Sequence, residues 1–281
     1  MRPMPVTSAV DARDLVVRYG DNTALDRSTF SIPAGTITAV IGPNGSGKST
    51  LLNAIAGLVD PAGGDIEVPA RADGARRISY VLQTTKVNES LPVSVREVVT
   101  MGRYAELGAY GWLAAEDRNE IAAAMERTGI TDLASRQLHE LSGGQRQRVF
   151  VAQGMAQSHD LLLLDEPLTG IDMTTARAID EAIHAERSRG CTVILTTHDL
   201  SEAQVADHVV LLAGRVVASG PPGEVLTVAN LKDAYGPSVL HLDEGSFFID
   251  DAAHAPVDER HVHRERSIHT EASQTDTHSS G

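Results

Sequence analysis

The chain has 281 residues, 42% of them hydrophobic and 22% charged, which is an ordinary globular composition with room for one large α/β domain and a minor subdomain. A formal net charge of −14 argues against general affinity for nucleic acid or anionic lipid, so no nucleic-acid partner is expected. No apolar run approaches the roughly 20 residues that cross a bilayer, residues 1–14 lack the apolar stretch of a secretory signal, and the single cysteine, Cys191, excludes an intrachain disulfide and fits a reducing cytoplasm.

Strand and helix patterns alternate along much of the chain. Short strands are predicted at residues 15–19 and 28–32, and a β-branched run at 36–41 leads through glycines into a helical pattern at 51–58. Further strands are predicted at 78–82, 161–164 and 192–196, with an exposed helix at 180–189 and a hairpin at 209–218. This alternation predicts a mostly parallel sheet covered by helices.

Two regions depart from this alternation. Between about residues 84 and 158 helical patterns dominate, at 95–101, 116–127 and 145–157, which predicts an inserted helical subdomain. The segment 237–281 is acidic, contains histidine and, beyond 250, is poor in large apolar residues. Because it cannot bury enough surface to offset the entropy of ordering, it is predicted to be a largely disordered tail after a folded domain at 1–236.

A glycine-rich loop follows the strand at 36–41 and opens a helix, which is the setting of a P-loop. Its glycines allow successive backbone N–H groups to face an anion, Lys48 supplies a charge for the β- and γ-phosphates, and the Ser49 hydroxyl suits Mg²⁺. The alternative is a glycine turn that binds nothing, but the lysine, the hydroxyl and the flanking elements favour ATP binding. The loop consists of Gly42, Pro43, Asn44, Gly45, Ser46, Gly47, Lys48, Ser49 and Thr50.

Two adjacent carboxylates, Asp165 and Glu166, end the apolar strand at 161–164. Neighbouring side chains of a strand point to opposite sides, so the pair can divide its tasks. Asp165 is predicted to hold Mg²⁺, and Glu166 to polarise the water that attacks the γ-phosphate. An acidic pair after a strand is otherwise most often a solvated strand end.

A second anion site is predicted at the start of the helix at 145–157, where Leu141 is followed by Ser142, Gly143, Gly144 and Gln145. The alternative is an ordinary serine N-cap followed by glycines. The segment resembles the signature sequence of ABC ATPases. That resemblance covers roughly residues 11–236 and implies a P-loop NTPase fold with a RecA-like parallel-sheet core, an N-terminal antiparallel β subdomain and an inserted helical subdomain.

The resemblance assigns roles to four further residues. Tyr19 matches the aromatic residue that stacks on adenine, and Gln83 the glutamine that senses Mg²⁺ and the membrane subunit. Asp172 matches the aspartate of the loop at the dimer interface, and His198 the histidine that reaches the γ-phosphate. Each has a plainer alternative, respectively packing, a polar strand end, an N-cap and a loop histidine, but their joint order favours the family roles.

The family's geometry also implies partners. Two copies pair head to tail, so that each ATP lies between Lys48 of one copy and Ser142 of the other. A membrane permease, served by an extracytoplasmic metal-binding protein, holds the ATPase at the cytoplasmic face of the cell membrane.

The region at 91–104, with Trp112 downstream, Arg148 to Phe150 and the segment 169–172, resembles zinc and manganese importers, which predicts import of a transition metal, with zinc before manganese. Importers of the iron-siderophore or cobalamin type have a similar stretch at 101–104 and are the main competitor. Leu82 stands where many relatives have proline and Gln153 where many have arginine. A non-transport ABC ATPase is the more distant alternative, and a small-molecule kinase leaves residues 141–145 and His198 unexplained.

The tail carries histidines among carboxylates, a combination that suits zinc. A solvated tail with only weak metal binding is the alternative. The histidines are His254, His261, His263, His269 and His278.

Overall fold

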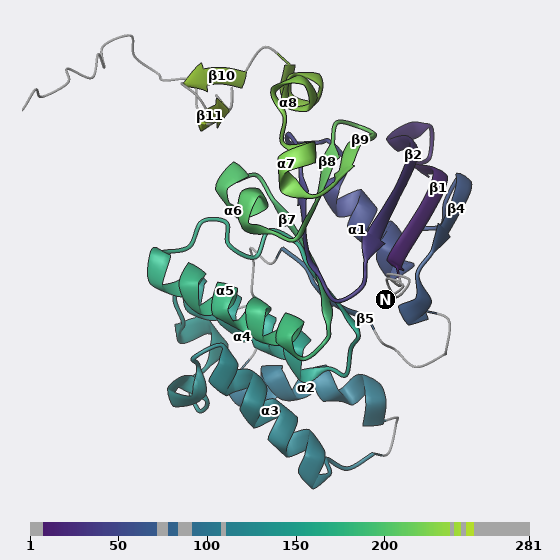
Figure 1. Ribbon diagram of the computed structural model, residues 1–281. Helices are drawn as coiled ribbons and strands as arrows, with labels where there is room; N and C mark the ends of the chain where they lie inside the picture. Colours follow the sequence, from purple (N-terminus) through teal and green to yellow (C-terminus); the bar gives the residue numbers. More distant parts are fainter. Residues whose placement is uncertain are drawn as a thin grey trace, which may run out of the picture. The chain divides into compact units, whose positions relative to one another are not determined.

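The structure is a computed structural model that describes residues 8–71, 78–83, 92–107, 111–236, 239–242 and 246–249 (Figure 1). An antiparallel sheet lies at the start of the chain, with the order β2-β1-β4. It contains β1 (Ser8–Tyr19), β2 (Asn22–Pro33) and β4 (Gly63–Glu67). The strands predicted at 15–19 and 28–32 are the C-terminal parts of β1 and β2, and a tight turn brings Tyr19 opposite Asn22.

The central sheet has six strands in the order β5-β6-β7-β3-β8-β9. All neighbours run parallel except the edge strand β9, which is antiparallel to β8. All residues of β3, β6, β7 and β8 are buried. Burial on both faces explains why these strands are nearly continuous apolar runs in the sequence. The predicted parallel core is confirmed. Its strands are β3 (Ile37–Ile41), β5 (Ile78–Val81), β6 (Leu161–Leu164), β7 (Thr192–Thr197), β8 (His208–Leu212) and β9 (Val216–Gly220).

The two faces of the central sheet pack against different layers. Leu161 and Leu163 of β6 join a core with α1 (Lys48–Ala56) and the antiparallel sheet. Leu162 and Leu164, pointing the other way, join a core with α5 (Met173–Ser188) and the helices that precede β6. The predicted helix at 180–189 is therefore only the second half of α5.

The described chain between β5 and β6 is helical, in agreement with the pattern at 84–158. It contains α2 (Val95–Leu107), α3 (Ala115–Arg127) and α4 (Gly143–Ala156), with 3₁₀ turns at Thr131–Leu133 and Leu138–Glu140. The three helices contact one another, and α4 also contacts β5, β6 and α5. Another 3₁₀ turn, Pro69–Arg71, follows β4.

Three short helices that the sequence patterns did not reveal pack around β8. They are α6 (Leu200–Val205), α7 (Pro222–Val225) and α8 (Val228–Tyr235). Within the described residues, no helix is both long and apolar enough to span a bilayer.

Part of the predicted tail forms two strands, which differs from the expectation of disorder for residues 239–242 and 246–249. Strands β10 (Val239–Leu242) and β11 (Ser246–Ile249) pair in antiparallel register. Both are rich in aliphatic or aromatic residues, which favour strands, and the polar composition of the remainder obscured this signal. The five tail histidines and the rest of the tail, 250–281, lie outside the described residues.

Candidate functional site

The predicted site residues follow the carboxyl ends of neighbouring parallel strands. The glycine loop follows β3, Gln83 follows β5, Asp165 and Glu166 follow β6, and His198 follows β7. Because β5, β6, β7 and β3 are consecutive in the sheet, these segments meet at one edge. In open α/β sheets ligands bind outside this edge.

The loop at 42–50 borders a cavity of about 380 Å³. Gly47 caps α1 with φ 100°, a conformation that favours glycine, and a side chain at Gly42 would collide with the Leu212 carbonyl. Successive N–H groups at the start of α1 therefore face this space, as a phosphate site requires. The cavity is lined by Asn22, Thr23, Ala24, Asn44, Gly45, Gly47, Lys48, Ser49, Thr50, Glu166 and Gly214.

Lys48 is buried beneath the loop, with 7% of its surface exposed. Its Nζ donates to the carbonyl oxygens of Gly42 (2.9 Å) and Pro43 (3.2 Å). The Ser46 hydroxyl is also buried and has no hydrogen-bond partner among the described residues. A lysine cation and an unpaired buried hydroxyl beside the start of a helix are suited to an anionic ligand.

The two carboxylates after β6 are held by one threonine of β7. The Thr196 hydroxyl donates to Asp165 Oδ1 at 2.6 Å and accepts the backbone N–H of Glu166 at 2.8 Å. Thr196 is fully buried and Asp165 is 7% exposed, so this contact is shielded from water. Glu166 has a φ of 48°, unusual for a residue other than glycine, which turns its side chain away from the line of the strand into the cavity.

Gln83 and Glu166 are brought together, since Gln83 Nε2 donates to Glu166 Oε2 at 2.9 Å. His198 is exposed directly after β7. Tyr19 is 47% exposed, lies opposite cavity residue Asn22 across the β1–β2 turn, and accepts a long, 3.5 Å hydrogen bond from Asn53.

The predicted second anion site is separate from the cavity. Ser142 caps α4: its hydroxyl accepts the Gln145 N–H at 3.2 Å and its own N–H donates to Gln145 Oε1 at 3.0 Å. Gly144 packs against Asp172 and Thr175, where a methyl group would lie 2.9 Å from Thr175 Oγ1. None of residues 142–145 is among those that line the cavity, and Ser142 and Gly143 are exposed.

Asp172 is the N-cap of α5. It accepts the Thr175 N–H at 3.0 Å and the Thr175 hydroxyl at 2.8 Å, and these bonds hold the pKa of its carboxyl below the ordinary value. The N-cap alternative is thus correct as local structure, and it does not exclude an interface role at an exposed helix start.

Sequence reasoning missed Thr196 and the wall formed by Asn22, Thr23 and Ala24. The available signal for Thr196 was the pair of hydroxyl residues, Thr196 and Thr197, that ends the strand after a run of aliphatic residues. No sequence pattern indicated that the β1–β2 turn comes back to the loop.

Comparisons with known proteins match the part of the chain that carries these motifs. The family model described as "ABC transporter" matches residues 25–169. The chain is 38% identical over 238 residues to the manganese transport system ATP-binding protein MntB of Bacillus subtilis (strain 168), covering 84% of this chain and 95% of the relative. It is 40% identical over 234 residues to the zinc transport system ATP-binding protein TroB of Treponema pallidum (strain Nichols), covering 81% and 87%. A solved structure described as "an inward-facing conformation of a putative metal-chelate type ABC transporter" is similar with a TM-score of 0.74 and 28% identity, covering 86% of this chain and 96% of that one.

Proposed function

The chain belongs to the ABC transporter family of ATP-binding subunits, and on that premise we propose that it powers the import of a transition-metal ion through a separate membrane permease. It is an ATPase, as that family implies. The cavity that joins Lys48 and Glu166 is the observation that supports the chemistry. The similarity to metal-transport ATP-binding proteins supports the cargo.

The buried lysine prepares the loop for phosphate. In the absence of nucleotide its amine is held by two loop carbonyls, and the β- and γ-phosphates of ATP would replace these partners. The Lys48 amine therefore has hydrogen-bond partners both with and without ATP, so that its charge is never buried unpaired. Tyr19, beside the cavity and half exposed, supplies a face on which adenine can stack.

Glu166 is the general base of the proposed mechanism. Its side chain lines the cavity, and its position is fixed by the backbone bond to Thr196 and by the amide of Gln83. From there it can accept a proton from the water that attacks the γ-phosphate. His198, after the adjacent strand β7, would donate to the γ-phosphate.

Oxygen donors suited to Mg²⁺ lie at the same edge. The Asp165 carboxylate, the Ser49 hydroxyl and the Gln83 amide oxygen are the hard ligands that this ion prefers, and Thr196 orients the carboxylate. When bound, Mg²⁺ neutralises part of the phosphate charge.

A second copy of the chain is the proposed partner at the nucleotide. The cavity lacks Ser142 and Gly143, which are exposed at the start of α4, and the start of a helix suits an anion. A head-to-tail dimer would place this helix start of one copy over the ATP of the other. Asp172, packed beside Gly144, would lie at the same interface.

A groove between α2, α4 and the end of β5 supports docking of the permease; we call it the α2–α4 groove. Its volume is about 320 Å³, and its walls include Leu82, Met101, Gly102, Phe150 and Gln153. Leu82 is 54% and Met101 41% exposed, so the groove presents apolar surface next to Gln83. The permease would hold the chain at the cytoplasmic face of the membrane and receive metal from an extracytoplasmic binding protein.

Zinc is proposed before manganese as the cargo, although the 40% and 38% identities to TroB and MntB are too similar to separate them. The metal-chelate description of the similar transporter favours the iron-siderophore type as the second candidate. The test is ATP-dependent uptake of radioactive zinc, manganese and ferric siderophore into vesicles that contain the chain and the permease encoded beside its gene. Uptake of siderophore without either free ion would overturn the metal-ion assignment.

Replacing Glu166 by Gln tests the chemistry. Hydrolysis should slow by about 10²–10⁴-fold, the usual contribution of a general base, while ATP binding remains. The variant should then accumulate as an ATP-bound dimer in size-exclusion chromatography. A variant that stays monomeric in saturating ATP would contradict the proposed dimer.

A further inference from the structure

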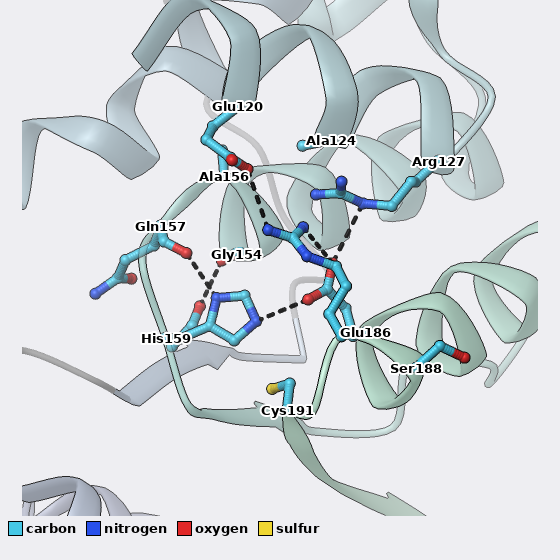
Figure 2. A network of polar contacts seen from close by, with 12 residues as sticks. Glu120, Ala124, Arg127, Gly154, Ala156, Gln157, His159, Glu186, Ser188 and Cys191 are labelled. Carbon is cyan, nitrogen blue, oxygen red and sulfur yellow. Dashed lines mark hydrogen bonds and ion pairs between the residues drawn. The ribbon is translucent and has the colours of Figure 1, made fainter. Parts of the chain in front are cut away.

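A second cluster of chemically reactive side chains lies at the amino ends of the central strands, opposite the edge that carries the candidate nucleotide site. His159 precedes β6 by two residues and Cys191 immediately precedes β7. The parallel register that pairs Leu161 with Thr192 brings the two together. Glu186, near the end of α5, completes the cluster (Figure 2).

The three side chains converge on one point. One ligand atom from each of His159, Glu186 and Cys191 lies within 4.8 Å of the other two. His159 Nδ1 is 2.6 Å from the Gln157 carbonyl oxygen, which can only accept, so Nδ1 carries a proton and Nε2 faces the cluster. Nε2 is 3.3 Å from Glu186 Oε2, yet it makes no hydrogen bond within the described structure, although the His159 side chain is only 4% exposed.

This spacing is that of metal ligands. Zinc bonds of about 2.0–2.1 Å to nitrogen and oxygen at the tetrahedral angle separate the two ligand atoms by about 3.3 Å. The observed 3.3 Å between Nε2 and Oε2 matches that edge. The Cys191 sulfur lies within 4.8 Å of both, and a zinc–sulfur bond of about 2.3 Å would place it about 3.6 Å from each of them.

The surroundings hold the ligands in the required orientation. Glu186 Oε1 is engaged by Arg127 Nε at 3.2 Å and Arg189 Nη1 at 3.5 Å, which leaves Oε2 directed at His159. The imidazole is fixed by the Gln157 carbonyl, as histidine ligands commonly are. A cavity of about 420 Å³ adjoins all three ligands and reaches Glu120 and Arg189, whose side chains are 42% and 47% exposed. An ion thus has an entry path, and a water molecule has space as a fourth ligand.

We propose that His159, Glu186 and Cys191 form a binding site for a zinc-like divalent transition-metal ion, distinct from the ATP site. The nitrogen, oxygen and sulfur donor set favours zinc, or cobalt as its probe, over manganese, which prefers oxygen ligands. The site depends only on these residues and not on the identity of the transported cargo.

A buried ion pair between His159 and Glu186 is the competing account. Burial lowers the pKa of His159, but the neighbouring Cys191 sulfur and Glu186 carboxylate outweigh it and raise the pKa to about 10, so a proton competes with the metal. A divalent ion would displace the imidazolium proton and bind the sulfur as thiolate. The two charges of the ion then offset those of the carboxylate and the thiolate, so Arg127 and Arg189 remain compatible with the bound ion. The ion pair accounts for Nε2 and Glu186 Oε2, whereas Cys191 Sγ, which donates to the Thr192 carbonyl oxygen at 3.3 Å, converges on the same point without taking part in it.

Cobalt titration of the full-length, metal-stripped chain tests the proposal. Cys191 is the only cysteine, so a thiolate-to-cobalt charge-transfer band in the near ultraviolet reports on this site alone, whereas the tail histidines cannot produce one. We expect a band that saturates at one cobalt per chain and is abolished by equimolar zinc, but not by equimolar manganese. The absence of a band at millimolar cobalt would overturn the site, and equal displacement by manganese would overturn its zinc-like character.

Matched variants separate this site from other zinc bound by the chain. Cys191→Ser should remove the band and weaken the tightest zinc-binding event by at least about tenfold, and His159→Gln should weaken it similarly. His261→Asn, in the tail, should leave the band unchanged. Thermal unfolding without metal checks that each variant is folded. Zinc affinity that is identical in folded Cys191→Ser and wild type would refute the proposal.

Discussion

Thr196 is expected to support both the stability of the sheet edge and the ATPase reaction, and its replacement by the isosteric Val separates its hydroxyl from its volume. The hydroxyl makes two buried hydrogen bonds, one to the Asp165 carboxylate and one from the Glu166 N–H. A hydrogen bond to a charged group contributes about 1.5–3 kcal/mol, and an unpaired buried N–H costs about 1–3 kcal/mol. Because Val gains some hydrophobic burial, we expect Thr196→Val to lower the free energy of unfolding by about 2–4 kcal/mol.

Urea unfolding measures the stability change, and steady-state ATP hydrolysis measures the functional one. With the orientation of Asp165 lost, kcat should fall by about 10–100-fold, the usual cost of removing a partner of a metal ligand. Thr196→Ser is the control: it keeps the hydroxyl and loses one methyl group, so it should cost only about 1 kcal/mol and leave kcat within a few-fold of wild type. If Val and Ser variants were equally stable and equally active, the hydroxyl would not hold the carboxylates as described.

Other predictions concern separate parts of the molecule. Lys48→Ala should weaken ATP binding, measured by calorimetry, by at least about tenfold, since charged hydrogen bonds worth about 1.5–3 kcal/mol are lost; unchanged affinity would remove Lys48 from the phosphate site. Burial lowers the pKa of His208 below its usual 6.5, so stability is full above pH 6.5 and declines as the pH falls below it. Urea unfolding between pH 7 and 5 should therefore show a steeper loss for wild type than for His208→Gln, and parallel curves would contradict this. Met101→Glu should abolish co-purification with the permease while the ATPase activity of the isolated chain is kept, whereas Val205→Glu, at an exposed position outside the α2–α4 groove, should keep both.

The central fold could be predicted because its strands are buried on both faces. Such strands, like residues 161–164, are continuous apolar runs that need no knowledge of their partners. Strand β4 and helices α6 to α8 were not predicted, because short elements such as Gly63–Glu67 take their stability from neighbours rather than from a pattern of their own. The hairpin of β10 and β11 was missed for a related reason, since composition was averaged over a longer polar segment.

Some residues of the candidate site could likewise be predicted from the sequence, and others could not. Local motifs identified the glycine loop and the Asp165–Glu166 pair, since their chemistry is contiguous in the chain. The contact of Thr196 with those carboxylates, and that of His159 with Cys191, depend on the register of β6 with β7, over some thirty residues of intervening sequence. No sequence pattern encodes that register, so these residues emerge only when the strands are paired.

Helix α4 links two of the surfaces described above and can act as a lever. Ser142 begins it, and near its other end the Gly154 carbonyl accepts the Ser79 hydroxyl at 2.8 Å, beside the α2–α4 groove. Fourteen residues at 1.5 Å each make it about 20 Å long. Ser142 lies 12 residues, or about 18 Å, from Gly154, so a tilt of about 10° about the Gly154 end would move it by about 3 Å, about the length of a hydrogen bond. In the proposed dimer, a small rotation imposed at the groove would therefore make or break the contact of Ser142 with a phosphate on the facing copy.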